Sequence, residues 1–203
     1  MVAVFKNYYL ENSYQSYVNW IIPETGQVTD WRCVIVPKSK AYNQIRAILN
    51  NHFDSSVYFW ADYQRQYFPQ NMHIDDYGKD RQHPTYTIVI PLVDDSRLKT
   101  IVWKDMFPSN KEWNEYVMTW KKEEHTKKNN ISELVDLDHN FYKEYGEYIG
   151  EYMDIDAVFE YHVGDYVLFD TNQIHSSSTW VRYKEYEYKD LVQIHITDTT
   201  KTL

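Results

Sequence analysis

Short runs of β-branched and aromatic residues recur along the chain, and they constrain its fold more than any other feature. Such runs, bounded by turn residues, are typical of β-strands. The predicted strands are residues 17–22, 31–36, 56–63, 86–92, 98–103, 157–163, 164–170 and 189–195. We expect strands and turns throughout the first forty residues, and a hairpin between 86–92 and 98–103, because only a short polar loop separates those two runs. The sequence therefore predicts a mainly β fold.

Two segments carry helical signals instead. Ser39 offers an N-cap, and the apolar residues after it follow at helical spacing, which predicts an amphipathic helix over about 40–51 packed on a sheet. Ser109 with Glu112 forms a capping box, so the region near 104–155 is predicted to be a mostly helical insert between core strands. A β core interrupted by one insert predicts a single domain over residues 1–203.

Composition narrows the class of protein. Hydrophobic residues make up 43% of the 203 residues and aromatic residues 17%, which is too high for a disordered chain. The net charge of −9 argues against broad binding to nucleic acid or to an anionic membrane. Cys33 is the only cysteine, so no intrachain disulfide can form, and a reducing compartment such as the cytoplasm fits best. No run has the length needed to span a membrane, and no signal peptide is evident.

A His-x-Asp motif and a distant histidine are the candidate metal ligands. His73 and Asp75 are two residues apart, so on an extended strand their side chains project from one face. His175 follows the predicted strand 164–170. Two imidazoles and a carboxylate on one face of a metal leave the opposite positions open, as non-haem Fe(II) oxygenases require for a co-substrate and O₂. Asp76 would replace Asp75 if the register slipped by one residue. The remaining candidates, interpreted as structural or pocket-lining, are His83, His162 and His195.

The chain resembles the 2-oxoglutarate/Fe(II)-dependent dioxygenases, nearest to their prolyl-hydroxylase-like branch. The segments that carry the resemblance are His73-Ile74-Asp75, the run TIVIPL at 87–92, the run GDYVLFD at 164–170 before His175, and the run KDLVQIH at 189–195. The resemblance implies a double-stranded β-helix, a jelly roll of two facing sheets with the metal at its mouth. It also implies Fe(II) bound by His73, Asp75 and His175, with 2-oxoglutarate and O₂ as co-substrates and with succinate and CO₂ as products of a hydroxylation.

A basic residue that opens the strand after the distal histidine would, by the same resemblance, pair with the far carboxylate of 2-oxoglutarate. Lys189 is one candidate, because from it Leu191, Gln193 and His195 share a mixed polar face suited to a pocket wall, while the alternate positions are aliphatic. Arg182 lies nearer to His175 and is the rival. Tyr63, on the strand that leads to the motif, stands where some relatives place a tyrosine that hydrogen-bonds the co-substrate.

Two other functions compete with a 2-oxoglutarate enzyme. A cupin-like metalloenzyme would use the same β architecture without 2-oxoglutarate, but it needs a further ligand near the first motif. A non-catalytic jelly-roll protein would use its aromatic surface to bind a sugar or a protein. For the oxygenase we expect a small-molecule or peptide substrate. Trp113, Trp120 and nearby tyrosines of the insert are expected to face either the iron pocket or a partner subunit of a homodimer, the alternative being a buttress on the outside of a sheet.

Overall fold

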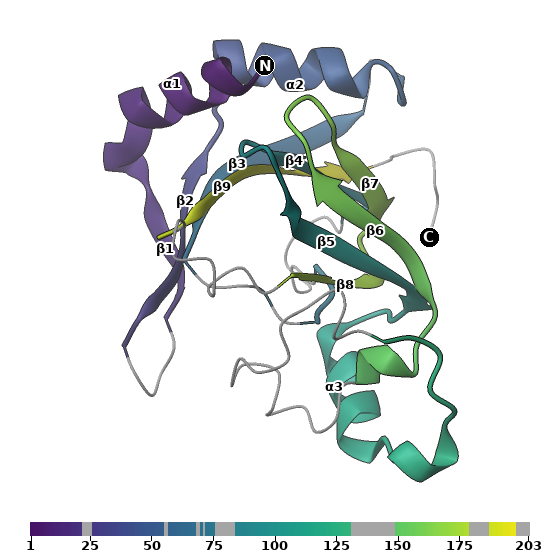
Figure 1. The fold of residues 1–203 in the computed structure, drawn as a ribbon. Coiled ribbons are helices and arrows are strands. Elements are labelled where there is room, and N and C mark those ends of the chain that lie inside the picture. The colour runs from purple at the N-terminus through teal and green to yellow at the C-terminus, as the bar shows by residue number, and fades with distance from the viewer. Residues whose placement is uncertain are drawn as a thin grey trace.

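The computed structural model describes residues 1–21, 26–54, 57–67, 70, 72–75, 84–130, 149–178 and 187–197. Its described strands form two antiparallel sheets (Figure 1). The larger sheet has, in spatial order, β1 (Tyr17–Ile21), β2 (Val28–Val34), β3 (Tyr58–Gln66), β9 (Lys189–Thr197), β4 (Tyr86–Pro91) and β7 (Val167–Asp170). The smaller sheet has β6 (Ile155–Tyr161), β5 (Asp95–Met106) and β8 (Gln173–Ser177). This mainly β, jelly-roll-like architecture confirms the predicted fold class.

The last strand of the chain lies at the centre of the larger sheet. β9 pairs with β3 on one side and with β4 on the other, so segments far apart in sequence become neighbours. A core between the two sheets joins apolar side chains from both of them, namely Val89, Leu98, Val102, Tyr161, Phe169 and Leu191. The candidate ligand His175 lies on β8 of the smaller sheet, and His73 pairs with it.

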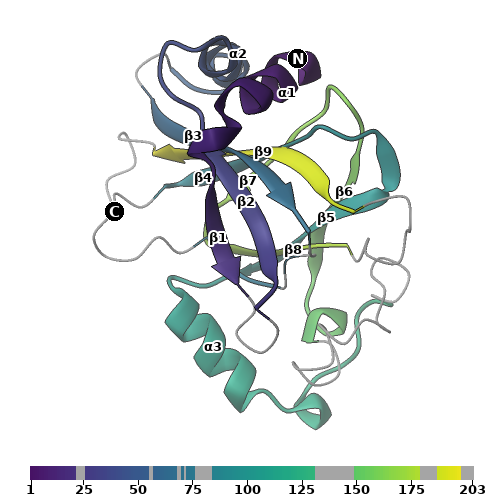
Figure 2. The same cartoon turned by 90° about the vertical axis from the view of Figure 1, so that its left-hand side faces the viewer.

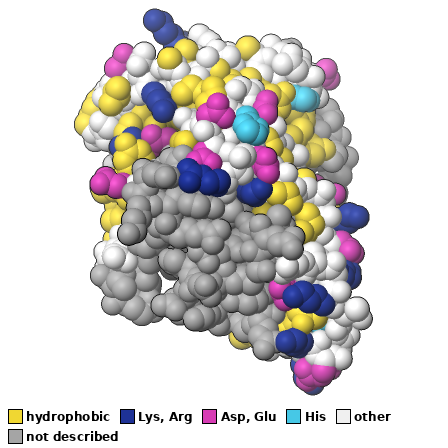
Figure 3. Space-filling model, in the orientation of Figure 1, with side chains coloured by type: hydrophobic (Ala, Val, Ile, Leu, Met, Phe, Trp, Pro, Cys, Tyr) yellow, Lys and Arg dark blue, Asp and Glu magenta, His cyan; other side chains and the backbone are white. Residues whose placement is uncertain are grey.

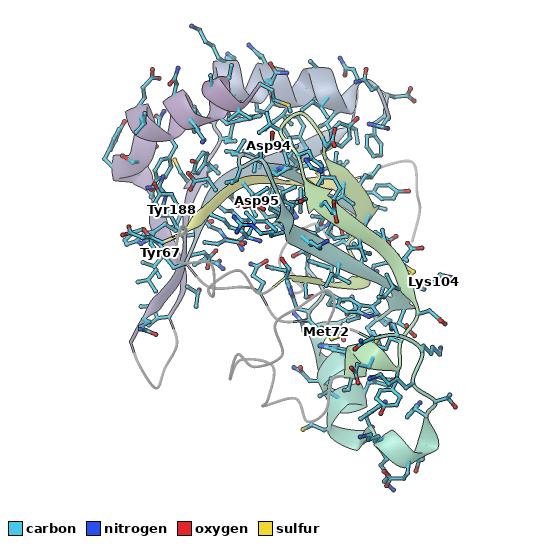
Figure 4. The ribbon with its side chains drawn as sticks, viewed as in Figure 1. Tyr67, Met72, Asp94, Asp95, Lys104 and Tyr188 are labelled. Atoms are coloured by element: carbon cyan, nitrogen blue, oxygen red, sulfur yellow. The ribbon has the colours of Figure 1, made fainter. Side chains whose placement is uncertain are left out.

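The predicted hairpin between residues 86–92 and 98–103 is wrong. β4 belongs to the larger sheet and β5 to the smaller one, so the connection through Asp94 and Asp95, labelled in Figure 4, passes from one sheet to the other. Alternation of apolar residues shows that a segment is a strand, but it does not say which strand will pair with it. Here both segments find their hydrogen-bond partners elsewhere in the chain.

Two helices cover the outer face of the larger sheet (Figures 1 and 2). The helix α2 (Lys40–Leu49) confirms the prediction, and its cap residue Ser39 accepts a hydrogen bond from the Tyr42 amide. The helix α1 (Val2–Asn12), followed by the short 3-10 helix η1 (Ser13–Gln15), corrects the expectation of strands and turns there. Its β-branched and aromatic residues favour strands locally, and tertiary packing overrides that preference. The buried side chains of this helix are Phe5 and Tyr8.

The helix α3 (Asn110–Thr119) lies at the opposite end of the molecule from α1 and α2 (Figure 2). The side chain of Ser109 accepts a hydrogen bond from the Glu112 amide at 3.3 Å, which confirms the predicted N-terminal cap. β5 extends to Met106, so the insert begins slightly later than expected. Two short 3-10 helices follow, η2 (Lys122–Glu124) and η4 (Ile149–Glu151). The second predicted helical piece of the insert falls largely on residues 131–148, outside the described residues.

The described surface mixes charges of both signs. On the face shown in Figure 3, acidic and basic side chains are interspersed rather than gathered into a stripe of one sign. Together with the net charge of −9, the described residues on that face provide no basic track for a nucleic-acid backbone. Among the helices that the structure describes, none combines the length and apolar character of a membrane span.

Candidate metal centre

Backbone pairing places the two predicted histidine ligands side by side. His73 and His175 form an isolated antiparallel bridge, in which the His73 amide donates to the His175 carbonyl at 3.0 Å and the reverse bond is 2.9 Å. Their ring centroids are 4.3 Å apart. The Asp75 amide donates to the Thr171 carbonyl at 3.2 Å, which attaches the next residue of the motif to the turn before β8.

The carboxylate completes a compact group of three candidate ligands. Asp75 Oδ1 lies 3.8 Å from His73 Nε2 and 3.7 Å from His175 Nε2. The ligand atoms of all three residues lie within 4.8 Å of one another, and no other His, Cys, Asp or Glu group with this property occurs in the described part of the chain. Two imidazole nitrogens and one carboxylate oxygen form the donor set of a non-haem iron site.

The hydrogen bonding of His175 fits a metal ligand. Its Nδ1 lies 2.9 Å from the Gln173 carbonyl oxygen, which can only accept, so Nδ1 carries the proton and Nε2 presents a lone pair. This Nε2 is buried and receives no hydrogen bond from any described residue, although it faces the group formed with Asp75. A buried acceptor without a donor is costly, and a metal ion would remove that cost.

Asp75 has one oxygen engaged and one turned toward the imidazoles. Thr87 Oγ1 donates to Asp75 Oδ2 at 2.7 Å, and Gln193 Nε2 donates to the same oxygen at 3.0 Å. Burial alone would raise the pKa of Asp75, but the imidazoles of His175, His195 and His73 together hold it well below its ordinary value. Thr87 and Gln193 therefore orient the carboxylate, and its Oδ1 faces both imidazoles.

A pocket between the sheets extends from His175. The larger sheet lines it with Gln64, Gln66, Val89, Lys189, Leu191 and Gln193, and the smaller sheet and the residues near it contribute Thr100, Tyr161, His175, Ser176 and Ser177. Most of these side chains are polar, so the wall can hold a charged ligand in a fixed orientation.

Lys189 is a buried cation in this pocket. Only 1% of its surface is exposed, and its ammonium donates to the Tyr161 hydroxyl at 3.3 Å and lies 4.9 Å from the centroid of that ring. Among the described residues it has no carboxylate partner, and burial lowers its pKa to about 7. The Tyr161 hydroxyl in turn lies 2.9 Å from Thr100 Oγ1. A buried ammonium with only neutral neighbours is suited to an anionic ligand that enters the pocket.

The alternation predicted for β9 agrees with the observed packing. Lys189, Leu191 and Gln193 line the pocket. On the other face of β9, Val192, Ile194 and Ile196 join the core beneath α1 and α2. His195 is fully buried, with its ring centroid 3.9 Å from that of Trp60 and its Nδ1 3.5 Å from Thr87 Oγ1. His162, by contrast, lies at the surface, 3.1 Å from an Asp94 oxygen.

Tyr63 lies on the opposite face of the sheet from the pocket, so the structure contradicts the expected contact with a co-substrate. Its ring stacks on Tyr9 with centroids 4.4 Å apart and belongs to the core beneath the helices. Burial first, and then Asp190, raises the pKa of Tyr63. The physical reason is the two-residue repeat of β3, which points Gln64 into the pocket and the residue before it away. The other candidates Arg182, Asp76 and His83 lie outside the described residues.

The sequence interpretation missed several pocket residues. On β3, Asp62, Gln64 and Gln66 are polar residues at two-residue spacing, which is the signal of a polar inner face. Thr87, which does not line the pocket but donates to Asp75, shares a face of β4 with the pocket residue Val89. Tyr161 had no such signal, because tyrosines are common throughout this chain.

Comparison with known proteins supports the fold. No protein-family model matches the chain, and no curated protein matches it in sequence. Among solved structures, a Pseudomonas putida prolyl-4-hydroxylase aligns over 97% of this chain and 87% of its own, with 10% identity and a TM-score of 0.52. The α-ketoglutarate-dependent epimerase SnoN of nogalamycin biosynthesis aligns over 97% and 74%, with 13% identity and a TM-score of 0.56. The carbocyclase SnoK of the same biosynthesis aligns over 97% and 75%, with 12% identity and a TM-score of 0.55. The fold is thus the one shared by these enzymes, as the sequence resemblance predicted.

Proposed function

We propose that this protein is an Fe(II)- and 2-oxoglutarate-dependent dioxygenase. The observation that carries the proposal is that His175 joins two features, the group of three candidate metal ligands and the pocket that holds a buried lysine. The ligand atoms of His73, Asp75 and His175 lie close together, and His175 Nε2 is a buried acceptor that receives no hydrogen bond from the described residues. Lys189, a buried ammonium without a carboxylate partner among the described residues, lines the same cavity as His175. A metal cation and a dianionic co-substrate would satisfy both groups.

Each residue has a defined task in this proposal. His73 Nε2, His175 Nε2 and Asp75 Oδ1 hold the iron and leave its other positions open. Iron held by these three residues, with 2-oxoglutarate bound, would supply the activation of O₂ and the oxidative decarboxylation that yields succinate and CO₂. Lys189 binds the distant carboxylate of the co-substrate as a point charge. The hydroxyl groups of Tyr161 and Thr100 lie close enough to help orient that carboxylate.

The proposed substrate is a small molecule or a peptide in the cytoplasm. The interspersed surface charges and the net charge of −9 argue against a nucleic-acid substrate. Hydroxylation is the proposed outcome, since it is the reaction named for the prolyl-4-hydroxylase of the same fold. The neighbours named as an epimerase and a carbocyclase indicate that this fold also carries other oxidative outcomes.

Anaerobic titration tests the proposal without knowledge of the substrate. Purified protein is titrated with Fe(II) and then with 2-oxoglutarate, and the metal-to-ligand charge-transfer band is recorded. We expect one Fe(II) per chain and a band that saturates with 2-oxoglutarate. The His175→Ala variant should lose both, whereas His162→Ala, which removes a surface imidazole, should retain both.

The same experiment separates the competing functions. Fe(II) binding without a band on addition of 2-oxoglutarate would favour a cupin-like metalloenzyme. Absence of metal binding by the unmodified protein would overturn the enzyme proposal and favour a binding protein. Slow release of succinate in air, measured without a primary substrate, would add direct evidence of the proposed reaction.

A further inference from the structure

Three glutamine side chains form a chain of hydrogen bonds that ends at the carboxylate of Asp75. Gln66 Nε2 donates to Gln64 Oε1 at 3.1 Å, Gln64 Nε2 donates to Gln193 Oε1, and Gln193 Nε2 donates to Asp75 Oδ2 at 3.0 Å. Gln64 and Gln66 come from β3 and Gln193 from the adjacent strand β9. All three line the pocket.

The carboxylate of Asp75 fixes the direction of every hydrogen bond in this chain of glutamines. A carboxylate that binds a metal is deprotonated and can only accept, so Gln193 must turn its amino group toward Asp75. Its oxygen then faces Gln64, which must present its own amino group. The same argument turns the amino group of Gln66 toward Gln64 and leaves Gln66 Oε1 as the terminal acceptor. This atom is buried and receives no hydrogen bond from the described residues.

Because the three glutamines are buried, the orientations of their side-chain amides depend on one another. The exposed fractions are 0% for Gln64, 2% for Gln66 and 4% for Gln193, so water competes little for these amides. If one amide turned over, two oxygens would face each other without a proton between them, which is costly in a buried site. Each glutamine therefore holds the next one in its orientation.

We propose that Gln66, Gln64 and Gln193 are a positioning relay that keeps Asp75 Oδ2 engaged and Asp75 Oδ1 turned toward the metal. The inference rests on the proposed function in taking Asp75 as a metal ligand. Gln193 contacts Asp75 directly, whereas Gln64 acts only through Gln193. Thr87 donates to the same Oδ2 by a separate route, so it offers an independent comparison.

Substitution by methionine removes the amide while keeping the length of the side chain. In Gln193→Met we expect about a tenfold loss of Fe(II) affinity, as for other partners of metal-bound carboxylates. Gln64→Met should show a smaller loss, although it touches neither Asp75 nor the imidazoles. The double variant Gln64→Met/Gln193→Met should bind Fe(II) no more weakly than Gln193→Met alone, because Gln64 acts through Gln193.

A second double variant gives the matched control. Thr87→Val with Gln64→Met should lose affinity by the product of the two single effects, because these residues reach Oδ2 by different routes. Additive losses in the Gln64/Gln193 pair, or an unchanged affinity in Gln64→Met, would overturn the relay. Such a result would leave the proposed function intact, because that proposal fails only if the unmodified protein does not bind Fe(II) or shows no charge-transfer band with 2-oxoglutarate.

A measurement on the metal-free protein distinguishes positioning from a general loss of structure. The side-chain amide protons of Gln193 should exchange slowly in nitrogen-15 spectra, since one is bonded to Asp75 and the group is buried. In Gln64→Met their exchange should quicken while the backbone amides of β9 stay protected. Fast exchange of the Gln193 amide protons in the unmodified protein would contradict the relay.

Discussion

The two walls of the candidate site are built in different ways. Lys189 and Gln193 stand on β9, whose nine residues are all buried and which is paired on both edges, with β3 and with β4. His73 and Asp75 stand on a short segment whose backbone, among the described residues, bonds to other backbone only through one isolated bridge and the Asp75 amide. The wall formed by β9 is therefore positioned by regular sheet geometry, and we call it the regular wall. The wall formed by the segment of His73 and Asp75, the irregular wall, needs support from side chains.

That support comes from the helical insert. Trp113 of α3 packs in one core cluster with Ile74, the residue between the two candidate ligands. Its indole nitrogen donates to the Met72 carbonyl at 3.3 Å, and Figure 4 shows Met72 close to this helix. For Trp113 the structure thus favours the buttress over the expected lid or subunit interface. Trp120, half-buried, stacks on His125 with ring centroids 5.3 Å apart.

Removing the charge of Lys189 from the regular wall should have the largest effect on 2-oxoglutarate binding. In Lys189→Met we expect the concentration of 2-oxoglutarate that half-saturates the charge-transfer band to rise roughly a hundredfold, equivalent to about 2–3 kcal/mol for a charge-assisted contact in a buried pocket. Fe(II) should still bind. Lys99→Met, which removes a lysine that pairs with Glu160 at the surface, is the control. If only Arg182→Ala gives this phenotype, Lys189 has been given the wrong role.

The pH dependence of 2-oxoglutarate binding should reveal the same lysine with a smaller effect. Burial lowers the pKa of Lys189 to about 7, so above that pH the ligand-free protein holds a neutral amine. A dianion favours the ammonium, so binding must take up a proton, and affinity should fall by up to about tenfold per pH unit. Titrations from pH 6 to about pH 9 measure this slope.

The matched variant for the pH dependence is Lys189→Arg. A guanidinium remains charged across this range, so the fall in affinity should disappear even if the absolute affinity changes. Calorimetry in two buffers with different ionisation enthalpies should also detect proton uptake in the unmodified protein alone. An unchanged slope in Lys189→Arg would show that another group titrates.

The regular wall was also the more predictable of the two. The alternation along 189–195 assigned Lys189, Leu191 and Gln193 to the face that lines the pocket, because a two-residue repeat within one strand is a local property. His195, predicted on the same face, is buried against Trp60 and does not line the pocket. The His-x-Asp spacing and the strand before His175 likewise led to the three residues that the structure brings together. Their role as metal ligands stays a prediction until the titration is done.

What could not be predicted depends on distant contacts. The helix α1 has strand-favouring residues and becomes helical where Phe5 and Tyr8 are buried against the rest of the protein. Its Tyr8 hydroxyl donates to the Val34 carbonyl at 2.7 Å, a contact that no local pattern reveals. The pairing of β4 and β5 with different sheets is likewise a property of topology. The buttressing of Ile74 by Trp113 required knowledge of where the insert packs.

Weakening the irregular wall tests the buttress. We expect Trp113→Ala to lower the free energy of unfolding by about 3–5 kcal/mol, as for large aromatic residues in a core. It should also weaken Fe(II) binding severalfold in the protein that remains folded, because the segment of His73 and Asp75 loses its support. Phe59→Ala is the control, since both side chains are 4% exposed and Phe59 lies beneath the helices.

In Phe59→Ala we expect a comparable loss of stability with unchanged Fe(II) affinity. Thermal unfolding and anaerobic Fe(II) titration at a temperature where both variants are folded provide the two measurements. Equal Fe(II) affinities in the two variants would show that α3 supports the fold in general and not the irregular wall.

The smallest effect is expected on the far face of the regular wall. Tyr63 and Gln64 are adjacent on β3, but Tyr63 packs beneath the helices and Gln64 lines the pocket. In Tyr63→Phe the half-saturating concentration of 2-oxoglutarate should stay within about twofold of the unmodified protein. Stability should fall by about 1 kcal/mol at most, because only one hydroxyl and its hydrogen bonds are lost. Thermal unfolding and titration of the charge-transfer band measure the two quantities. A large rise in the 2-oxoglutarate requirement would mean that the register of β3 is shifted by one residue, which would also remove Gln64 and Gln66 from the pocket and break the relay to Asp75.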